Sequence, residues 1–197
     1  MNIQQRIAEV LAAEAAAIAS VRVTPEFERA VVALRDTRGK VLTSGMGKAG
    51  HIARKFASTL CSTGTPASYV HPGEAAHGDL GLVGANDCMV AFSTSGKTRE
   101  VLEMLRLGRQ LGLHTVIGIT SHPDSALRDL SDHVLDMGVI EEPCIHGLTP
   151  SASTAVMLAI SDALALVLME LKGVSRADYG LRHHGGYRGT AAGRDPS

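Results

Sequence analysis

The sequence predicts an α/β domain in which a mainly parallel sheet is covered by helices on both faces. Short apolar segments, such as residues 88–92 and 116–119, alternate along the chain with longer segments of helical periodicity. This is the pattern of strands that are buried on both faces and joined by crossover helices. Aromatic residues make up only 3% of the chain and Trp is absent, so small aliphatic side chains must pack the helices against the sheet.

The predicted helices are recognised by a periodic apolar face or by an N-terminal signal. Residues 2–20 repeat apolar side chains at helical spacing. Thr24, followed by Pro25 and Glu26, marks the start of a second helix. Further helices are predicted around residues 52–60, over 101–111, near 126 and over 151–171, and strands over 40–43, 68–70, 88–92 and 116–119 and near 134–135.

The chain is predicted to form one domain, because its 197 residues show no internal repeat and no linker. That length is sufficient for a single well-buried core. Within residues 1–197 we distinguish N-terminal helices over 2–36, an α/β core over 38–173 and a C-terminal tail over 174–197.

Composition and charge exclude several classes of partner. The net charge is −1 without a block of Lys and Arg, so nucleic acid is not expected as a partner. The most apolar segment, residues 155–169, contains Ser161 and Asp162 and is shorter than the roughly 20 residues that cross a bilayer, so no membrane partner is expected. The polar N-terminus has no signal-peptide pattern, and three cysteines without a CxxC pair suit a reducing compartment; a cytoplasmic protein is expected.

Ligands of parallel α/β sheets bind beyond the carboxyl ends of the strands, and the first loop there is rich in glycine. Residues 44–50, Ser-Gly-Met-Gly-Lys-Ala-Gly, allow backbone amides to approach an anion, and Lys48 adds a positive charge. A plain tight turn explains the same glycines. The loop lacks the P-loop spacing, and no acidic residue ends the next strand as in dinucleotide sites, so no cofactor is expected.

Two further loops carry polar side chains. Residues 93–98, Ser-Thr-Ser-Gly-Lys-Thr, offer four hydroxyls and a helix N-terminus, which together can surround a phosphate, whereas helix capping would use only one hydroxyl. Residues 71–79 contain two His, a Glu and an Asp, but their spacing is not that of a metal-binding helix. A hydrogen-bonded sugar pocket without metal is the preferred interpretation.

Three segments resemble the arabinose-5-phosphate isomerases, which carry the sugar isomerase (SIS) domain. They are Gly-Met-Gly-Lys-Ala-Gly-His-Ile at residues 45–52, Ser-Thr-Gly-Thr-Pro at 62–66 and His-Pro-Gly-Glu-Ala-Ala-His-Gly-Asp-Leu-Gly at 71–81. The resemblance runs from about residue 5 to about residue 188. It implies a Rossmann-like, five-stranded parallel sheet flanked by helices on both faces, and a homotetramer with active sites at subunit interfaces. Family members usually carry a paired CBS module after this domain, which the 197 residues do not include.

The resemblance also implies a function and a set of site residues. The family interconverts D-ribulose 5-phosphate and D-arabinose 5-phosphate, feeding synthesis of the acid Kdo for lipopolysaccharide or capsule, with a sugar phosphate as the small-molecule partner. The residues that match the family's catalytic positions are Lys48, Glu100, Glu142 and His183. Those expected to bind substrate are Ser44, Gly47, His77, Ser93, Thr94, Ser95 and Thr98.

These residue types suit an aldose–ketose isomerisation, in which a base moves a proton between C1 and C2 through an enediol. We expect Glu142 to be that base, His183 to open the sugar ring or shuttle protons, and Lys48 to bind negative charge. Glu100 would orient a hydroxyl. Two alternatives remain open: another phosphosugar isomerase, such as a 6-phospho-3-hexuloisomerase, or a non-catalytic SIS module that senses a sugar phosphate. A binding module could dispense with Glu100, Glu142 and His183, so the presence of all three favours an enzyme.

Overall fold

The structure is a computed structural model and describes residues 1–183. Its centre is a five-stranded sheet with the strand order β2-β1-β3-β4-β5, in which every neighbouring pair is parallel. The predicted fold class and the five predicted strands are confirmed. The strands are β1 (Val41–Gly45), β2 (Ala67–Tyr69), β3 (Cys88–Phe92), β4 (Thr115–Thr120) and β5 (His133–Asp136).

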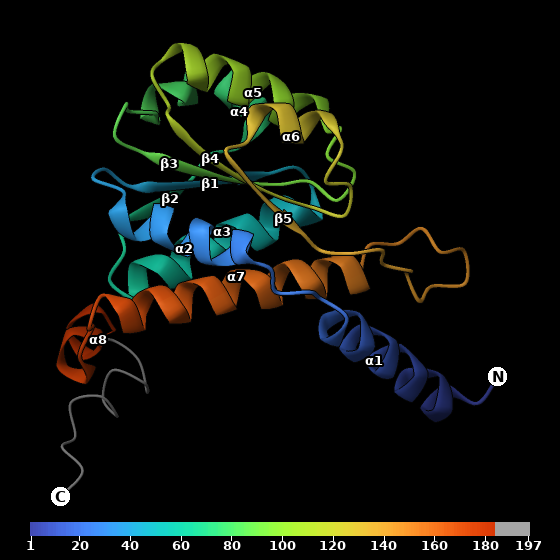
Figure 1. Ribbon diagram of the computed structural model, residues 1–197. Helices are drawn as coiled ribbons and strands as arrows, with labels where there is room; N and C mark the ends of the chain where they lie inside the picture. Colours follow the sequence, from blue (N-terminus) through green and yellow to red (C-terminus); the bar gives the residue numbers. More distant parts are fainter. Residues whose placement is uncertain (184–197) are drawn as a thin grey trace, which may run out of the picture.

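Helices form a layer on each face of this sheet (Figure 1). Helices α2, α3 and α7 cover one face, and α4, α5 and α6 cover the other. The helical elements are α1 (Ile3–Ala19), α2 (Pro25–Asp36), α3 (Lys48–Ser62), α4 (Pro72–Ala75), the 3-10 helix η1 (Asp79–Leu82), α5 (Arg99–Gln110), α6 (Ala126–Leu130), α7 (Ala152–Leu171) and α8 (Arg176–Arg182).

The two layers give two separate apolar cores, and strand β3 contributes to both. Successive side chains of a strand point to opposite faces of the sheet. Val90 and Phe92 therefore pack with α3 and α7, whereas Met89 and Ala91 pack with α5. All five residues of β3 are buried, which explains why this strand is a continuous apolar run rather than an alternating one.

Helix α7 is long and apolar because it belongs to the core. It is the one helix within residues 1–183 that is long and apolar enough to cross a membrane by length and composition, and half of its most apolar window is buried inside the domain. It packs against α1, α2 and α3. This is the environment of a core helix in an α/β domain.

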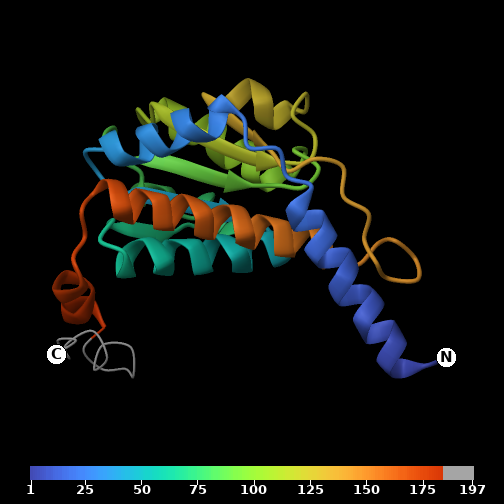
Figure 2. The ribbon, with the colours of Figure 1, turned by 60° about the horizontal axis from the view of Figure 1, so that its bottom comes forward.

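Helix α1 differs from the other long helices, because none of its residues is buried. Figure 2 shows it extending away from the body beyond the start of α7. Ile3, Ile7 and Leu11 lie one turn apart along the helix, and all three are more than half exposed. The amphipathic pattern in residues 2–20 thus predicted the helix correctly, although residues 1–183 leave its stripe of Ile3, Ile7 and Leu11 exposed.

Three short helical elements were not predicted. α4 and η1 lie in the polar loop after β2. α8 lies in the segment predicted to be a tail, where Ser175 and Asp178 form a capping box: each side chain accepts a hydrogen bond from the backbone N–H of the other residue. These elements have four to seven residues, too few for an apolar period to be visible. Residues 184–197 of the predicted tail lie outside the described residues.

Candidate active site

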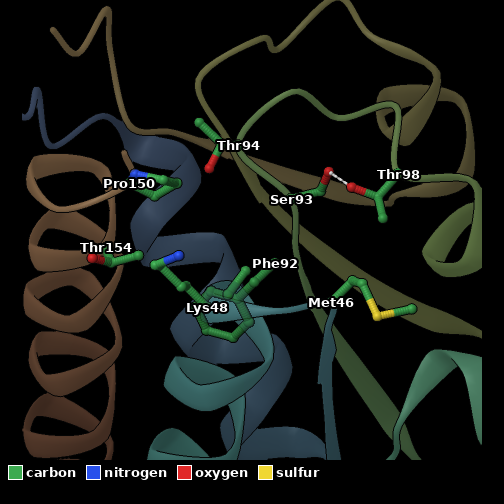
Figure 3. Close-up of a pocket in the computed structure, with 9 residues that line it drawn as sticks. Met46, Lys48, Phe92, Ser93, Thr94, Thr98, Pro150 and Thr154 are labelled. Atoms are coloured by element: carbon green, nitrogen blue, oxygen red, sulfur yellow. Dashed lines mark hydrogen bonds between the residues drawn. The ribbon is translucent and has the colours of Figure 1, made fainter. Parts of the chain in front are cut away.

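The site lies at the point in the sheet from which the strand order runs in opposite directions, toward β2 on one side and toward β4 and β5 on the other. Strands β1 and β3 are neighbours in its middle, and the chain leaves β1 for α3 on one face and β3 for α5 on the other. Such a switch point opens a crevice at the carboxyl ends of the two strands. A cavity of about 180 Å³ lies there (Figure 3), which is smaller than the roughly 300–1,000 Å³ of typical drug-binding pockets and suits a small metabolite. Its lining residues are Met46, Lys48, Ala49, Phe92, Ser93, Thr94, Thr98, Pro150 and Thr154.

The turn after β1 is built on close backbone packing. Gly47, the N-cap of α3, has a φ of +58°, a conformation that glycine adopts without strain. A Cβ atom on Gly50 would lie only 2.5 Å from the carbonyl oxygen of Gly45, so this position must also be glycine. The turn brings Lys48, the first residue of α3, to the cavity, where its amine points toward the α7 wall (Figure 3).

The loop after β3 presents its hydroxyls at the start of α5. The side-chain oxygens of Ser93 and Thr98 lie 2.8 Å apart and share a hydrogen bond, and both residues line the cavity. The loop is fixed from β4, because the carbonyl oxygen of Thr94 accepts hydrogen bonds from the Thr120 hydroxyl and the Ser121 backbone N–H. Hydroxyls, the N-terminus of a 12-residue helix and the Lys48 amine all lie at this cavity, and each of these groups can attract an anion.

Glu142 lies beside the third wall of the cavity, at the N-terminus of α7. Its Oε2 accepts hydrogen bonds from the backbone N–H groups of Ser151 and Ala152, each at 2.8 Å. Its Oε1 accepts from the backbone N–H of Ser153 at 3.3 Å and from the Ser153 hydroxyl. Burial of this carboxyl raises its pKa, but the hydrogen bonds, the Ser153 hydroxyl first, outweigh burial and hold the pKa below the ordinary value. Glu142 is therefore ionised and fixed in orientation at the start of α7, but it is not one of the residues that line the cavity.

Five other predicted site residues do not line the cavity. Ser44 is fully buried, and its hydroxyl donates to the carbonyl of Val70 at 2.7 Å, so it joins β1 to the end of β2 instead of lining the cavity. Gly47, His77, Ser95 and Glu100 are exposed and do not line it.

His183 lies at the opposite end of α7 from the cavity. It follows α8, which comes after the C-terminal end of α7 (Figure 1). A helix of 20 residues spans about 30 Å. The His183 ring stacks on Tyr179 with the ring centroids 4.4 Å apart, and its Nδ1 has no hydrogen-bond partner among residues 1–183. Within one chain, the fold brings Lys48, Ser93, Thr94 and Thr98 together around the cavity, places Glu142 at the start of α7 behind its third wall, and keeps His183 apart from them.

Sequence reasoning missed five of the lining residues. Met46, Ala49 and Phe92 carry no polar group; Met46 and Ala49 lie within the glycine-rich loop, and Phe92 directly precedes the hydroxyl loop. Pro150 and Thr154 belong to the hydroxyl-rich start of a long helix, where capping alone explains the sequence. Among residues 1–183, no group of three or more His, Cys, Asp or Glu is placed to hold a metal ion.

The fold and this cavity define a class: doubly wound α/β domains that bind a small anionic ligand at the switch point of the sheet. Residues 33–167 match the family model of the SIS domain. The chain belongs to the SIS domain family.

Two relatives illustrate the similarity in sequence. The chain is 42% identical over 168 residues to the arabinose 5-phosphate isomerase KdsD of Pseudomonas aeruginosa, covering 85% of this chain and 51% of the relative. It is 40% identical over 190 residues to KdsD of Escherichia coli K12, covering 95% and 58% respectively. The chain therefore spans little more than half the length of these curated relatives.

Two solved structures match over their whole length. One, from Bacteroides fragilis, is described as a phosphosugar isomerase involved in capsule formation; it has a TM-score of 0.92 and 43% identity, with 94% of this chain and 100% of that one covered. The other is the E. coli CFT073 protein c3406 in complex with arabinose 5-phosphate, with a TM-score of 0.88, 40% identity and coverage of 93% and 100%. The Vibrio vulnificus NanR protein complexed with ManNAc-6P, at 21% identity and a TM-score of 0.70, shares the fold alone.

Proposed function

We propose that this chain is an aldose–ketose isomerase that interconverts D-ribulose 5-phosphate and D-arabinose 5-phosphate. The observation that carries the proposal is the switch-point cavity, which is lined by the Lys48 amine and by hydroxyls, and whose α7 wall follows the backbone N–H groups that bind the Glu142 carboxylate. Identities of 40–42% to KdsD relatives and to the arabinose 5-phosphate complex support this substrate over a hexulose phosphate or a sensor role. In cells the product would feed Kdo synthesis.

The residues divide into a phosphate-binding set and a proton-transfer set. Ser93, Thr94 and Thr98 bind the phosphate with the N-terminus of α5, and Ser95 completes the loop around it. Glu142 removes the proton at C1 or C2, because it is ionised and is held at the start of α7, where Pro150 and Thr154 line the cavity. Lys48 stabilises the enediolate charge.

Glu100, the second residue of α5, and His77, between α4 and η1, are both exposed and would orient substrate hydroxyls. His183 opens the sugar ring in this proposal, and it acts in the cavity of a neighbouring copy. Its place beyond the far end of α7 supports this arrangement. We therefore propose a cytoplasmic homotetramer with active sites at subunit interfaces; the uncovered stripe of α1 provides apolar surface for such contacts.

The test is an assay of the purified chain with arabinose 5-phosphate, glucose 6-phosphate and 3-hexulose 6-phosphate, each with EDTA present. We expect turnover of the pentose phosphate alone and no effect of EDTA. Glu142→Gln should reduce kcat by at least about 100-fold while the fold remains intact, since it removes the base. Turnover of none of the three sugars, or near-normal activity of Glu142→Gln, contradicts the proposal.

A further inference from the structure

Ser153 makes contacts that serve Glu142 rather than its own helix. Its side chain lies at the second position of α7, and the residue is only 2% exposed. The hydroxyl donates to Oε1 of Glu142, the oxygen that also accepts the backbone N–H of Ser153. Ser153 does not line the cavity.

Helix capping does not require this hydroxyl. The N-terminus of a helix has free N–H donors and needs acceptors. Glu142 supplies them to the N-cap residue Ser151 and to the first two residues of α7, and Ser151 makes no side-chain capping hydrogen bond of its own. The Ser153 hydroxyl adds a fourth donor where donors are already present, so its effect falls on the carboxylate.

Each carboxylate oxygen of Glu142 accepts two of the four hydrogen bonds. An ionised carboxylate has about four lone-pair directions, two on each oxygen. Three of them are taken by backbone N–H groups, whose positions are fixed by the helix. The fourth is taken by a hydroxyl, whose hydrogen rotates about the Cβ–Oγ bond and can leave the oxygen free for a substrate proton.

We propose that Ser153 is a positioning residue for Glu142: its hydroxyl and its backbone N–H hold the carboxylate in one orientation. This inference rests on the proposed function, in which Glu142 is the proton-transfer base. The contact also agrees with the lowered pKa of Glu142, because the Ser153 hydroxyl is the largest of the effects that lower it.

Charged groups near Glu142 do not account for the same effect. On its own loop, Glu141 and Cys144 are its titratable neighbours. From α1, the Arg6 guanidinium donates to the carbonyl of Pro143, and from α3, Lys48 faces the cavity from another wall. Burial and hydrogen bonds are the causes of the pKa shift of Glu142, and a change at Ser153 leaves all four charged groups in place.

The test compares Ser153→Ala with Ser161→Ala. Ser161 is a fully buried residue of the same helix, and its hydroxyl donates to the carbonyl of Leu158 far from Glu142. Both variants replace Ser by Ala in α7, so both should fold. The full-length chain is labelled with ¹³C at the Glu carboxyl carbons, and the Glu142 signal is assigned by its loss in Glu142→Gln. Its titration midpoint is measured together with the pH profile of kcat/KM.

We expect the Glu142 midpoint to rise by about one pH unit in Ser153→Ala, since a hydrogen bond to the charged form is lost. The acid limb of kcat/KM should move up by the same amount, and kcat at pH 7.5 should fall about tenfold with KM within about twofold of wild type. Ser161→Ala should change none of these values. An unchanged midpoint in Ser153→Ala, or an equal rise in Ser161→Ala, overturns the inference. If the wild-type chain turns over no sugar phosphate, the proposed function fails, and the carboxyl titration still decides whether Ser153 acts on Glu142.

Discussion

Tyr69 donates its hydroxyl to the main-chain carbonyl of Gly45 across 3.0 Å. This bond joins the end of the edge strand β2 to the turn that carries Lys48. The hydroxyl also occupies the space beside Gly50, where a Cβ atom would approach it to 2.8 Å. The guanidinium of Arg54 lies over the Tyr69 ring, 4.3 Å from its centre, and stabilises the ring by a cation–π contact. One aromatic residue thus fixes the glycine turn.

Tyr69→Phe should weaken substrate binding more than catalysis. The ring and its contact with Arg54 remain, so the substitution removes only the hydrogen bond to Gly45. We expect KM for the sugar phosphate to rise about threefold to tenfold with kcat changed less than about twofold, and the free energy of unfolding to fall by about 1 kcal/mol. Steady-state kinetics and urea unfolding measure these effects. An unchanged KM together with an unchanged free energy of unfolding would show that the bond has no role in the turn.

Gly96→Ala should disrupt the hydroxyl loop. Gly96 has a φ of +61°, and a Cβ atom there would lie 1.7 Å from the Ser125 side-chain oxygen. The conformation alone costs about 1–2 kcal/mol for a residue with a side chain, and the collision must displace residues 93–98. We expect a lower free energy of unfolding and an increase of KM by about tenfold or more.

Two further variants separate the collision from the backbone strain. Gly138 has a φ of +80°, and nothing lies within 4 Å of the Cβ atom that Gly138→Ala adds. This variant should therefore lower the free energy of unfolding through backbone strain and leave KM unchanged. Adding Ser125→Gly to Gly96→Ala removes the colliding atoms and should recover most of the lost KM. If the double variant binds substrate no better than Gly96→Ala, the collision is not what disrupts the loop.

The fold was predictable because its main signals are local. β3 is a continuous apolar run, α7 is the longest mainly apolar segment, and α2 begins with the Thr24–Pro25–Glu26 signal. Alternation of such elements leads directly to a parallel sheet with crossover helices. The position of α8 was not predictable in this way, since its seven residues bury no side chain and only its capping box distinguishes it from a loop.

The site was predictable where the chain order places residues together. Residues 93–98 and Lys48 follow two strands that are neighbours in the sheet, and the loops after parallel strands meet at one edge. The role of Ser44 in joining strands was not predictable, because a serine at the end of a buried strand has the same sequence signal whether it faces a ligand or a carbonyl. The hydrogen bonds of Glu142 depend on a loop returning to the start of α7, which is a tertiary contact with no local pattern.

Cys144 should react faster with alkylating reagents than a typical cysteine. Its sulfur accepts hydrogen bonds from the backbone N–H groups of Thr149 and Leu148, each at 3.2 Å, and these lower its pKa to about 6. We expect the rate of modification by iodoacetamide to rise with pH and to reach half its maximum near pH 6. Cys88 is buried, which raises its pKa to about 12, and should remain unmodified in the folded chain. Peptide mapping by mass spectrometry separates the two sites; a half-maximum above pH 8 for Cys144 contradicts the prediction.

Asp87 should stabilise the fold at neutral pH and lose this effect in acid. Its side chain is 5% exposed and accepts hydrogen bonds from the Lys40 backbone N–H at 2.9 Å, the Lys40 amine at 2.7 Å and the Gly84 backbone N–H at 2.9 Å. Burial of the carboxyl raises its pKa, but these hydrogen bonds, the Lys40 amine first, outweigh burial and lower it. A carboxyl with a lowered pKa in the folded state contributes stability above its ordinary pKa of about 3.9, and the contribution disappears as the pH falls through the lower folded value.

Asp87→Asn should therefore reduce the free energy of urea unfolding by about 2 kcal/mol at pH 7, since the charged acceptor of three hydrogen bonds is lost. The difference from wild type should shrink progressively below about pH 4, because the wild-type carboxyl is then protonated as well. Asp36→Asn is the matched control, because Asp36 is exposed and pairs with the adjacent Arg35. The urea midpoint of this variant should stay at the wild-type value both at pH 7 and at pH 3. A constant difference between Asp87→Asn and wild type from pH 7 to pH 3 would mean that the charge of Asp87 contributes nothing, and that its hydrogen bonds act through geometry alone.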